Sequence, residues 1–504
     1  MFTGGNPGGE MIFDVDVIVV GAGPAGLLLA GDLAQAGVSC AVFERRSGRS
    51  GLTRAFTVYA RTLEQLDVRG AADELVALGT PLAELRLFAG AALDLSRLPS
   101  RFPYLLVAPQ YQTERVLEER AARVGADVRY GSEVTGLTQH PDGVEVKVRQ
   151  DGHPDRVVRA GWMVGADGIH STVRQALGIP FPGKAVVRSV MLAEVQLSQP
   201  PADVMTVSSI GEAFALLVPF GDGWYRVIAW HRRNQPSEDA PVSLAEVAEV
   251  TRQVFGTDYG MHDPRWISRF HSEERQVPRY RDGRVLLTGD AAHVHSPAGG
   301  QGMNTGIQDA ANLGWKLAAT VHGWAPDGLL DTYHAERHPV GRQVLRTSGA
   351  LLRLFTLPPA LVAARDVLTL AASRIPFAAN WLAGTLSGLT ISYPAPPGAH
   401  PLAGKRVADL PLADGRRLYE ALRGGRFLLA ASPGALPADA ADGYGDRVDA
   451  TPIGDASGIV ALIRPDAYIA WAATAAEITA PQIRDSLERW CGRPGQPAAQ
   501  PAHH

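Results

Sequence analysis

A glycine-rich turn near the N-terminus has the spacing of a phosphate-binding loop. Gly21, Gly23 and Gly26 form a G-x-G-x-x-G pattern, with Pro24 and Ala25 in its second gap. In such a loop the first glycine permits a tight turn, the second lets the backbone approach a pyrophosphate, and the third lets a helix pack on a strand. The phosphates would then bind at the free N–H groups and positive end of the helix that follows.

The segments around this turn are those that a dinucleotide site needs. Residues 15–20 form an apolar, β-branched run typical of a buried parallel strand, and residues 38–43 predict a second strand. The helix between them should end at Gly37. Glu44 follows the second strand, where a carboxylate can bind a ribose, and this favours FAD or NAD over NADP as the resident ligand. The alternative is a βαβ unit with a structural role only.

Two further carboxylates follow predicted strands. Residues 162–168 form a buried run that ends in Asp167 and a glycine, and residues 285–287 form a strand that ends just before Asp290. The carboxyl ends of parallel strands are where α/β sheets bind ligands. Asp290 could hold sugar hydroxyls there, whereas a single Gly-Asp pair could also be ordinary loop chemistry.

A second glycine-rich turn follows Asp290. Residues 299–302 should expose backbone N–H groups, and residues 305–321 predict a long helix whose N-terminus points at the same place. The positive end of that helix fits the electron-rich pyrimidine edge of a flavin.

Four arginines could serve a cofactor. Arg54 and Arg61 lie on a loop that runs into a helix, where each could face a flavin or a phosphate, or form a surface ion pair. Arg45 and Arg46 follow Glu44 and point mildly toward a phosphate on the electron donor.

Length and composition exclude several classes of protein. The 504 residues suffice for two or three domains, and a net charge of −4 gives no basic field for nucleic acid. The two cysteines form neither a disulfide framework nor a metal site. No apolar run is long enough for a membrane span, and the N-terminus lacks the pattern of a signal peptide. We therefore expect a cytoplasmic protein without metal, membrane or nucleic-acid partner.

The rest of the chain predicts two further units. Short apolar or alternating runs between residues 181 and 281 predict an antiparallel sheet, with a helix at 244–255. Aromatic residues of this region could line a pocket or form a plain hydrophobic core; they are Phe214, Phe220, Trp224 and Trp230. Residues 394–401 read as a proline-rich linker before a small α/β domain without a C-x-x-C motif.

Together these motifs resemble a known family. Residues 21–26, Asp167-Gly168 and the run 289–304 (GDAAH…P…GGQGMN) are similar to those of FAD-dependent single-component aromatic hydroxylases, the group of p-hydroxybenzoate hydroxylase. The closer resemblance is to bacterial hydroxylases of aromatic polyketides such as angucyclines, anthracyclines and tetracyclines. Shared segments at 60–67, 109–110, 400–412 and 464–471 extend this likeness over residues 12–490.

The resemblance implies an α/β fold with three units. A Rossmann-type FAD-binding domain would take residues 12–180 and 270–345, with an antiparallel substrate-binding sheet domain inserted at 181–269. A helical segment at 346–393 would lead to a C-terminal thioredoxin-like domain at 394–491.

The resemblance also implies a set of FAD-binding residues. They are Gly21, Gly23, Pro24, Ala25, Gly26, Glu44, Arg45, Arg54, Gln110, Val134, Asp167, Asp290, Pro297, Gly300, Gly302, Met303 and Asn304. Asp167 would serve both FAD and the passing nicotinamide cofactor. No catalytic base can be assigned, and the candidates near the flavin are Arg54, Tyr59 and Pro297. Tyr59 stands where many relatives carry His, a departure that would alter the substrate mouth.

The implied reaction is NAD(P)H-dependent monooxygenation. Reduced flavin would form a C4a-hydroperoxide with O₂ and pass one oxygen to a polycyclic aromatic polyketide, in natural-product biosynthesis. Baeyer–Villiger insertion or epoxidation on a similar scaffold is one alternative, and a flavin-bearing protein that sequesters a drug is another. The choice between NADH and NADPH, the ring position, and a monomer or homodimer stay open at this point.

Overall fold

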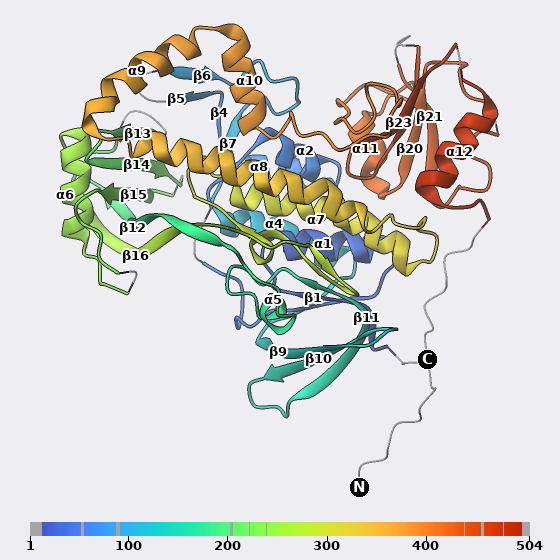
Figure 1. Cartoon of the computed structure of the whole chain (residues 1–504), viewed down its shortest axis with the longest axis horizontal. Helices are drawn as coiled ribbons and strands as arrows, with labels where there is room; N and C mark the ends of the chain where they lie inside the picture. The colour runs from blue at the N-terminus through green and yellow to red at the C-terminus, as the bar shows by residue number, and fades with distance from the viewer. Residues whose placement is uncertain are drawn as a thin grey trace.

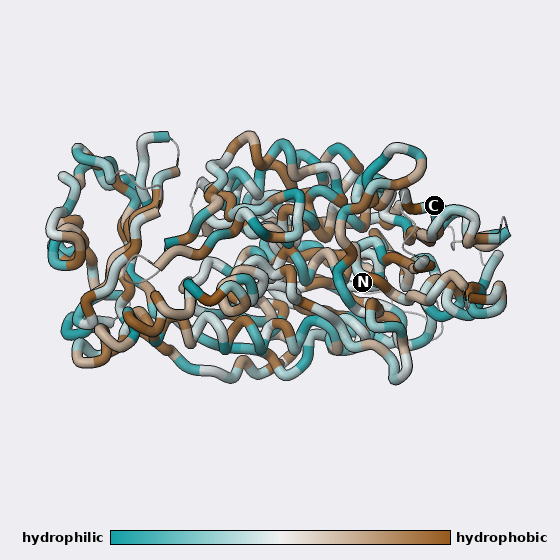
Figure 2. Tube along the Cα trace, turned by 90° about the horizontal axis from the view of Figure 1, so that it is seen from above, coloured by the Kyte–Doolittle hydropathy of each residue, from teal (hydrophilic) through white to brown (hydrophobic). Residues whose placement is uncertain are grey.

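The computed structural model describes residues 13–51, 55–86, 91–201, 205–220, 222–237, 239–437, 439–454, 458–476 and 478–495. Two large sheets lie side by side, two long helices cross the middle of the molecule, and a separate sheet domain closes the C-terminal end (Figure 1). Seen from above, hydrophobic and hydrophilic stretches are interspersed along an elongated body (Figure 2). Among the described residues, no single helix is long and apolar enough to span a membrane.

The first sheet is built on parallel strands. Its order is β17-β18-β11-β1-β2-β8, and β1 pairs in parallel with both β11 and β2. A hairpin of two strands, β9 and β10, is joined to the antiparallel extension of β11. The strands are β1 (Val15–Val20), β2 (Cys40–Phe43), β8 (Asp127–Arg129), β9 (Ser132–Gln139), β10 (Val144–Gln150), β11 (Arg156–Gly165), β17 (Arg281–Asp282) and β18 (Val285–Leu287).

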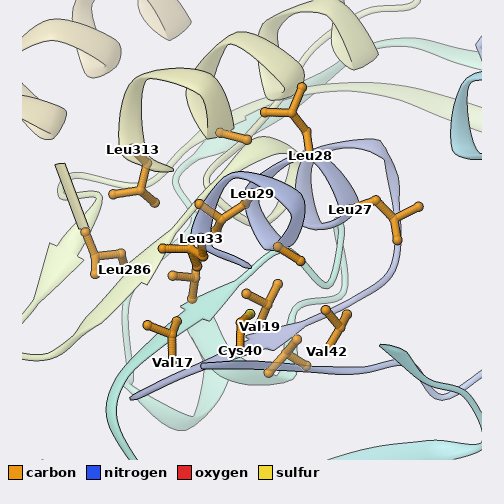
Figure 3. Packing of buried hydrophobic residues seen from close by; sticks show 14 of the residues in the cluster. Val17, Val19, Leu27, Leu28, Leu29, Leu33, Cys40, Val42, Leu286 and Leu313 are labelled. Atoms are coloured by element: carbon orange, nitrogen blue, oxygen red, sulfur yellow. The ribbon is translucent and has the colours of Figure 1, made fainter. Parts of the chain in front are cut away.

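Apolar residues of β1 explain why this sheet forms the main core. Val17, Ile18 and Val19 are fully buried, because helices cover the sheet and leave no solvent-exposed face at its centre. Leucines of α1 pack against β1 and β2, as Figure 3 shows for Leu29 and Leu33. The two cysteines, Cys40 in β2 and Cys491 near the C-terminus, are buried and unpaired.

The helices of this region pack on one another as well as on the sheet. Helix α1 contacts both α4 and α7, and α7 lies beside α8 in the middle of Figure 1. The helices are α1 (Pro24–Gln35), α2 (Ala60–Asp67), α3 (Ala72–Ala77), α4 (Gln110–Arg123), α5 (Thr172–Ala176), α7 (Gly302–Val321) and α8 (Thr332–Phe355), with the short 3₁₀ turn η2 (Gly289–Ala291). Helices α9 (Pro359–Ser373) and α10 (Pro376–Leu386) arch away from the end of α8.

The second large sheet is antiparallel and presents two different faces. Its order is β13-β14-β15-β12-β16-β19, and α6 (Leu244–Phe255) covers one face. The strands are β12 (Gly183–Leu197), β13 (Thr206–Ser209), β14 (Ala213–Pro219), β15 (Tyr225–His231), β16 (Met261–Gln276) and β19 (His293–Val294). The opposite face carries the predicted aromatic residues and turns toward α8 and the loop before α7.

Smaller sheets complete the structure. Three short strands, β3 (Thr57–Val58), β4 (Thr80–Leu82) and β7 (Leu105–Val107), form one sheet, and β5 (Glu84–Arg86) pairs with β6 (Ala92–Asp94). The C-terminal sheet has the order β21-β20-β22-β23. Its elements are α11 (Leu418–Ala421), η3 (Leu422–Gly424), β20 (Phe427–Ala431), β21 (Val448–Pro452), β22 (Ile459–Ile463), β23 (Ile469–Thr474) and α12 (Ala480–Cys491).

The predicted fold class is confirmed, with local differences. Strand β16 continues to Gln276, so the inserted sheet extends beyond the predicted limit at residue 269. Strand β11 begins at Arg156, well before the expected run at 162–168, because its first half pairs with β10. The domain boundaries themselves stay predictions, although residues 394–399 are exposed and carry no helix or strand.

Helix α2 is buried by the C-terminal domain. All eight of its residues are buried, including the charged ones. Glu64 pairs with Arg61 at 2.9 Å and with Arg406 of the C-terminal domain at 2.8 Å, while Asp67 pairs with Arg417 at 2.8 Å. Arg61 is buried in this ion pair, so the surface position that was one of the two expected from the sequence is wrong. Arg61 holds α2 against the C-terminal domain.

A buried charge cluster forms a second connection between these domains. Glu336 of α8 lies 2.8 Å from Lys316 of α7 and 2.7 Å from Arg464, which also pairs with Asp466 at 2.5 Å. Burial opposes ionisation of Glu336, but the attraction of Arg464 and Lys316 lowers its pKa to about 2. Burial lowers the pKa of Lys316 to about 8. The carboxylate of Glu336 thus neutralises two cations that have little access to water.

Replacing Glu336 tests this cluster. Glu336→Gln should lower the free energy of unfolding by about 3 kcal/mol or more, because it leaves Lys316 and Arg464 buried with a single carboxylate. Denaturant unfolding followed by circular dichroism measures the change. Glu212→Gln is the matched control, since Glu212 pairs with Arg233 at 3.2 Å near the surface and should contribute less than about 1 kcal/mol. Equal effects of the two substitutions would contradict this account.

Candidate functional site

Packing within the chain accounts for two of the three glycines in the turn after β1. Gly21 has φ +102°, and a Cβ atom there would lie 2.5 Å from the Ala166 carbonyl oxygen. A Cβ on Gly26 would lie 2.0 Å from the Gly21 carbonyl oxygen. Gly23 differs, because its φ of −81° suits any residue and a Cβ there would meet no protein atom within 4 Å. A pyrophosphate approaching the backbone would account for glycine at this position.

Glu44 is fixed beside this turn as an ionised group. One oxygen accepts a hydrogen bond from the Ala22 N–H at 2.8 Å, and the other accepts bonds from the backbone and side chain of Arg46 at 2.9 and 3.0 Å. Burial opposes ionisation, but the hydrogen bonds from Arg46 and Ala22 lower the pKa of Glu44. Arg45 next to it is exposed. The predicted contact of Glu44 with a ribose suits this placement and stays a prediction.

Asp167 lies against the same turn but uses its side chain within the protein. A Cβ on Gly21 would lie 3.0 Å from the Asp167 Cα. One carboxylate oxygen accepts a hydrogen bond from the Ser171 hydroxyl at 2.5 Å, and the other accepts the Val173 N–H at 3.1 Å. Asp167 thereby holds the first turn of α5, and burial raises its pKa. Its predicted double role toward FAD and nicotinamide is not seen in these contacts and stays a prediction.

The turn that carries Asp290 joins the other two. A Cβ on Gly289 would lie 3.4 Å from the Ala25 Cβ, and a Cβ on Gly306 of α7 would lie 3.2 Å from the Gly289 Cα. Asp290 itself is exposed. The strands β18, β11, β1 and β2 are adjacent in the sheet, so the residues after their carboxyl ends form one continuous edge.

The loop before α7 is held by Asn304. Its side-chain oxygen accepts the Tyr59 N–H at 2.9 Å, and its side-chain nitrogen donates to the carbonyls of Thr57 and Gly300, both at 2.9 Å. A Cβ on Gly300 would lie 2.1 Å from the Thr57 hydroxyl oxygen, so glycine is required there. These bonds place the glycine-rich loop against strand β3.

Tyr59 supports this loop from behind. Its hydroxyl donates a hydrogen bond to the Gly299 carbonyl at 2.6 Å, and the side chain is 5% exposed. Burial raises its pKa, so the phenol stays protonated at neutral pH. Tyr59 therefore helps to position the loop, and its predicted effect on the substrate mouth stays a prediction.

The other predicted cofactor residues surround the same region. Gln110 begins α4, and its side-chain oxygen accepts the Ala55 N–H at 3.0 Å. Arg54, which precedes Ala55, lies outside the described residues. Val134 is buried in β9, on the hairpin side of the sheet, and Pro297 is exposed on the loop before α7. Contact of each with FAD stays a prediction.

The N-terminus of α7 offers free backbone donors. The helix begins at Gly302, and the first intrahelical bond in its turn runs from the Thr305 N–H to the Gln301 carbonyl. The N–H groups of Gly302, Met303 and Asn304 therefore have no partner within the helix, and the helix dipole is positive there. Such donors suit a ring system that becomes negatively charged on reduction.

The sequence analysis missed His295 on the same loop. Its Nδ1 donates to the Ser296 carbonyl at 3.0 Å, and its Nε2 is buried without a hydrogen-bond partner among the described residues. Burial lowers its pKa to about 4, so the ring is neutral. A Cβ on Gly302 would lie 3.6 Å from His295, which places the imidazole at the start of α7. Its position two residues after the GDAAH run was the signal that could have identified it.

The inner face of the antiparallel sheet forms the opposite side of the site. The cluster on this face includes Phe214, Phe220, Trp224 and Trp230, together with Ala298 of the loop before α7. Two rings of the cluster, Phe214 and Trp230, stack at 5.8 Å between centroids. The four aromatic residues therefore share one face, which meets the loop that precedes α7.

A buried ion pair interrupts this aromatic face. Arg226 is fully buried, pairs with Glu194, and lies over the rings of Phe220 and Trp266 at 5.4 and 5.1 Å. The second oxygen of Glu194 accepts a bond from Arg265 at 2.6 Å. Burial lowers the pKa of Arg226 to about 10, so the guanidinium stays charged at neutral pH. The sequence alone did not indicate this ion-pair cluster, because Arg226, Glu194 and Arg265 come from three different strands.

Comparison with known proteins identifies the family to which this chain belongs. The family described as "FAD binding domain" matches residues 14–348, and the one described as "Aromatic-ring hydroxylase, C-terminal" matches residues 400–494. The chain belongs to the FAD-dependent aromatic-ring hydroxylases. The hydroxylase is therefore an FAD-dependent monooxygenase whose electron donor is NADH or NADPH.

Relatives of this hydroxylase include monooxygenases named for 12-dehydrotetracycline, anhydrotetracycline and rifampicin. It is 40% identical to the 12-dehydrotetracycline 5-monooxygenase/anhydrotetracycline 6-monooxygenase of Streptomyces rimosus, over 95% of this chain and 99% of that protein. It is 41% identical to the rifampicin monooxygenase of Streptomyces venezuelae, over 91% and 95% of the two chains. The solved structure of the anhydrotetracycline hydroxylase OxyS from Streptomyces rimosus is similar, with a TM-score of 0.85, 40% identity and coverage of 95% and 99%.

The resemblance to polyketide hydroxylases is thus confirmed, and the residues present fit FAD. The space beside Gly23 suits a pyrophosphate, the ionised Glu44 suits a ribose, and the first N–H groups of α7 suit a flavin ring. In the hydroxylase these three features lie at one edge of the sheet.

Gly23 provides a direct test of pyrophosphate binding. Gly23→Val should lower FAD affinity at least about tenfold, because the side chain would occupy the space next to the backbone without meeting the protein. Flavin absorbance per protein after gel filtration measures the retained FAD. Gly136→Val in β9 is the control, since a Cβ there meets only Lys147 at 3.9 Å. Normal FAD content in the Gly23 variant would refute the assignment.

Tyr59→Phe tests whether the loop before α7 depends on the buried hydroxyl. Loss of the bond to Gly299 should cost about 1 kcal/mol and weaken FAD binding about fivefold. Titration of the apoprotein with FAD measures this, and the pH profile of turnover should keep its shape because Tyr59 is no base. Tyr104→Phe is the control, because no hydrogen bond of its hydroxyl is found among the described residues. A changed pH profile with unaltered FAD affinity would show a catalytic role instead.

Proposed function

We propose that this monooxygenase hydroxylates a polycyclic aromatic polyketide in natural-product biosynthesis. The proposal rests on the names of its relatives and on one observation of the structure. The inner face of the antiparallel sheet is lined with aromatic side chains and meets the loop before α7, the loop whose residues would line the flavin. Planar fused rings are the substrates that such a face would bind best, through stacked or edge-to-face contacts.

The ion pair on this face gives the substrate an orientation. Arg226 and Glu194 form a buried ion pair among the aromatic residues of the face, and Arg226 is positively charged. A phenol or enol oxygen of a polyketide would interact favourably with the guanidinium, whereas an unsubstituted ring would gain nothing from it. The pair therefore favours oxygen-rich aromatic substrates over plain hydrocarbons.

The residues of the chain would act mainly by positioning and by excluding water. Bound FAD would supply the redox chemistry, taking two electrons from NAD(P)H and activating O₂ for transfer of one oxygen atom. Asn304 and Tyr59 hold the loop that would line the flavin, and the first N–H groups of α7 would stabilise negative charge on it. Leu352 and Phe355 of α8 pack on the aromatic face and keep water from the reacting carbon. A phenol is already activated for attack, so no dedicated base is needed.

We further propose that the protein works in the cytoplasm as a monomer or homodimer, with its aromatic substrate, O₂ and NAD(P)H as its partners. Metal, nucleic acid and membrane have no part in this proposal. The net charge of −4 gives no basic field for nucleic acid and supports that part of the proposal.

Substrate-stimulated consumption of NAD(P)H is the decisive experiment. A tetracyclic phenolic polyketide should increase NAD(P)H oxidation at least about tenfold over the rate without substrate, and NMR of the product should show a new hydroxyl on a ring carbon. A monocyclic phenol is the control and should stimulate weakly, because it covers little of the aromatic face. Ring expansion or an epoxide in the NMR spectrum would establish the Baeyer–Villiger or epoxidation alternative. Tight binding of the polyketide without any stimulation would favour the sequestering alternative.

A further inference from the structure

Trp230 carries a hydrogen-bond donor that the fold leaves unused. Its side chain is 5% exposed and lies on the inner face of the antiparallel sheet. The Nε1–H group is buried and has no hydrogen-bond partner among the described residues. A buried indole N–H normally finds an acceptor, because an unpaired donor is costly to keep away from water. The group is therefore available to an oxygen atom of a bound molecule.

The surroundings of this donor select the kind of oxygen. The ring of Phe214 stacks on Trp230 at 5.8 Å between centroids, and Phe355 lies 5.7 Å from Phe214. The guanidinium of Arg232 lies 5.6 Å from the centroid of the indole ring. An indole N–H and a guanidinium only donate hydrogen bonds, so the bound oxygen must accept. A keto oxygen does this without bringing an O–H group that would need an acceptor of its own among the rings.

Trp230 shares its side of the strand with the buried cation. Alternate residues of a strand point to the same face, and Ile228 and Trp230 of β15 both lie in the cluster on the inner face. Arg226 belongs to the same row, because its guanidinium lies over the rings of Phe220 and Trp266 of that cluster. Along the strand, Arg226 and Trp230 are about 13 Å apart. The face therefore has a cation at one end and a neutral donor at the other, with an aliphatic side chain between them.

This arrangement suits a long, flat molecule with an oxygen atom at each end. Several linearly fused aromatic rings span a distance of this order and can stack against the rings of the face. A phenol oxygen would interact favourably with the guanidinium of Arg226, and a keto oxygen at the far end would accept the N–H of Trp230. A molecule without the keto oxygen would leave the indole donor unpaired.

We propose that Trp230 binds the substrate: its indole N–H donates a hydrogen bond to a keto oxygen, and Arg226 meets a phenol at the opposite end of the fused rings. The inference rests on the proposed function, because it assigns each end of the aromatic polyketide to one end of the face. The preferred substrates are then fused aromatic ketones with a distant phenol. Such a molecule binds in one direction only, with its keto end toward Phe355 and its phenol end toward Phe220.

Two ligands of nearly the same shape test this hydrogen bond. 6-Acetyl-2-hydroxyanthracene has a phenol and a keto group at opposite ends, and 6-ethyl-2-hydroxyanthracene lacks the keto oxygen. Calorimetric titration of the FAD-loaded enzyme gives both dissociation constants. Trp230→Phe should raise the dissociation constant of the acetyl ligand about tenfold and leave that of the ethyl ligand within about twofold, because phenylalanine keeps an aromatic ring but has no donor.

Trp315→Phe is the matched control. Trp315 is 7% exposed, and its Nε1–H is likewise buried without a partner among the described residues. It packs against Phe427 of the C-terminal domain, with ring centroids 5.2 Å apart, and does not belong to the inner face of the antiparallel sheet. This substitution removes an equivalent donor and should leave both dissociation constants within about twofold.

Three results would overturn the inference. One is a wild-type enzyme that binds the two ligands equally or binds neither. Another is an unchanged affinity of Trp230→Phe for the acetyl ligand. The third is an equal loss of both affinities, which would leave Trp230 with a packing role only. The oxidation of NAD(P)H that a tetracyclic polyketide stimulates in the wild type tests the proposed function separately. If that stimulation were absent while Trp230→Phe still lost the acetyl ligand selectively, hydroxylation would be refuted and the role of Trp230 supported.

Discussion

Backbone contacts that leave no room for a Cβ atom hold the flavin site together. A Cβ on Gly21 would clash with the Ala166 carbonyl of the next turn, a Cβ on Gly26 would clash with the Gly21 carbonyl, and a Cβ on Gly306 would lie tightly against Gly289. These contacts join the turns that follow β1, β11 and β18, three neighbouring parallel strands. Since the strands are short, their ends cannot be moved apart without disturbing the whole sheet. The position of Asp290, Asp167 and the N-terminus of α7 therefore depends on a few glycines.

Much of the fold could be predicted because the core strands have a distinctive apolar, β-branched sequence pattern. The β-branched run at 15–20, the glycine turn and the apolar helix give the βαβ unit within a residue or two, and α6 matches its predicted bounds. Helix α2 shows the limit of such reasoning. Its charged residues suggest an exposed helix, but it is buried because Arg406, some 340 positions away, neutralises Glu64. A partner that distant leaves no local pattern.

The residues of the site were likewise only partly predictable from the sequence. Glycines and strand-end carboxylates are recognisable because the demands of a turn or a sheet edge are local. The ion pair of Arg226 and Glu194 is different, since each residue looks like a polar position of an ordinary half-exposed strand. Only the antiparallel pairing of β12 with β15 places them opposite each other, at the register Glu194↔Arg226. Tyr59 likewise gains its role from a loop that follows it by 240 positions.

The burial of the two cysteines has a chemical consequence for an enzyme that handles oxygen. Flavin monooxygenases release hydrogen peroxide whenever water reaches the active ring, and peroxide attacks the thiolate form of cysteine. Burial raises the pKa of Cys40 to about 12 and also raises that of Cys491. Both thiols are therefore almost entirely protonated at neutral pH and shielded from solvent. The folded enzyme should therefore resist oxidation by the peroxide that it releases. Its thiols should become open to oxidation when the chain unfolds.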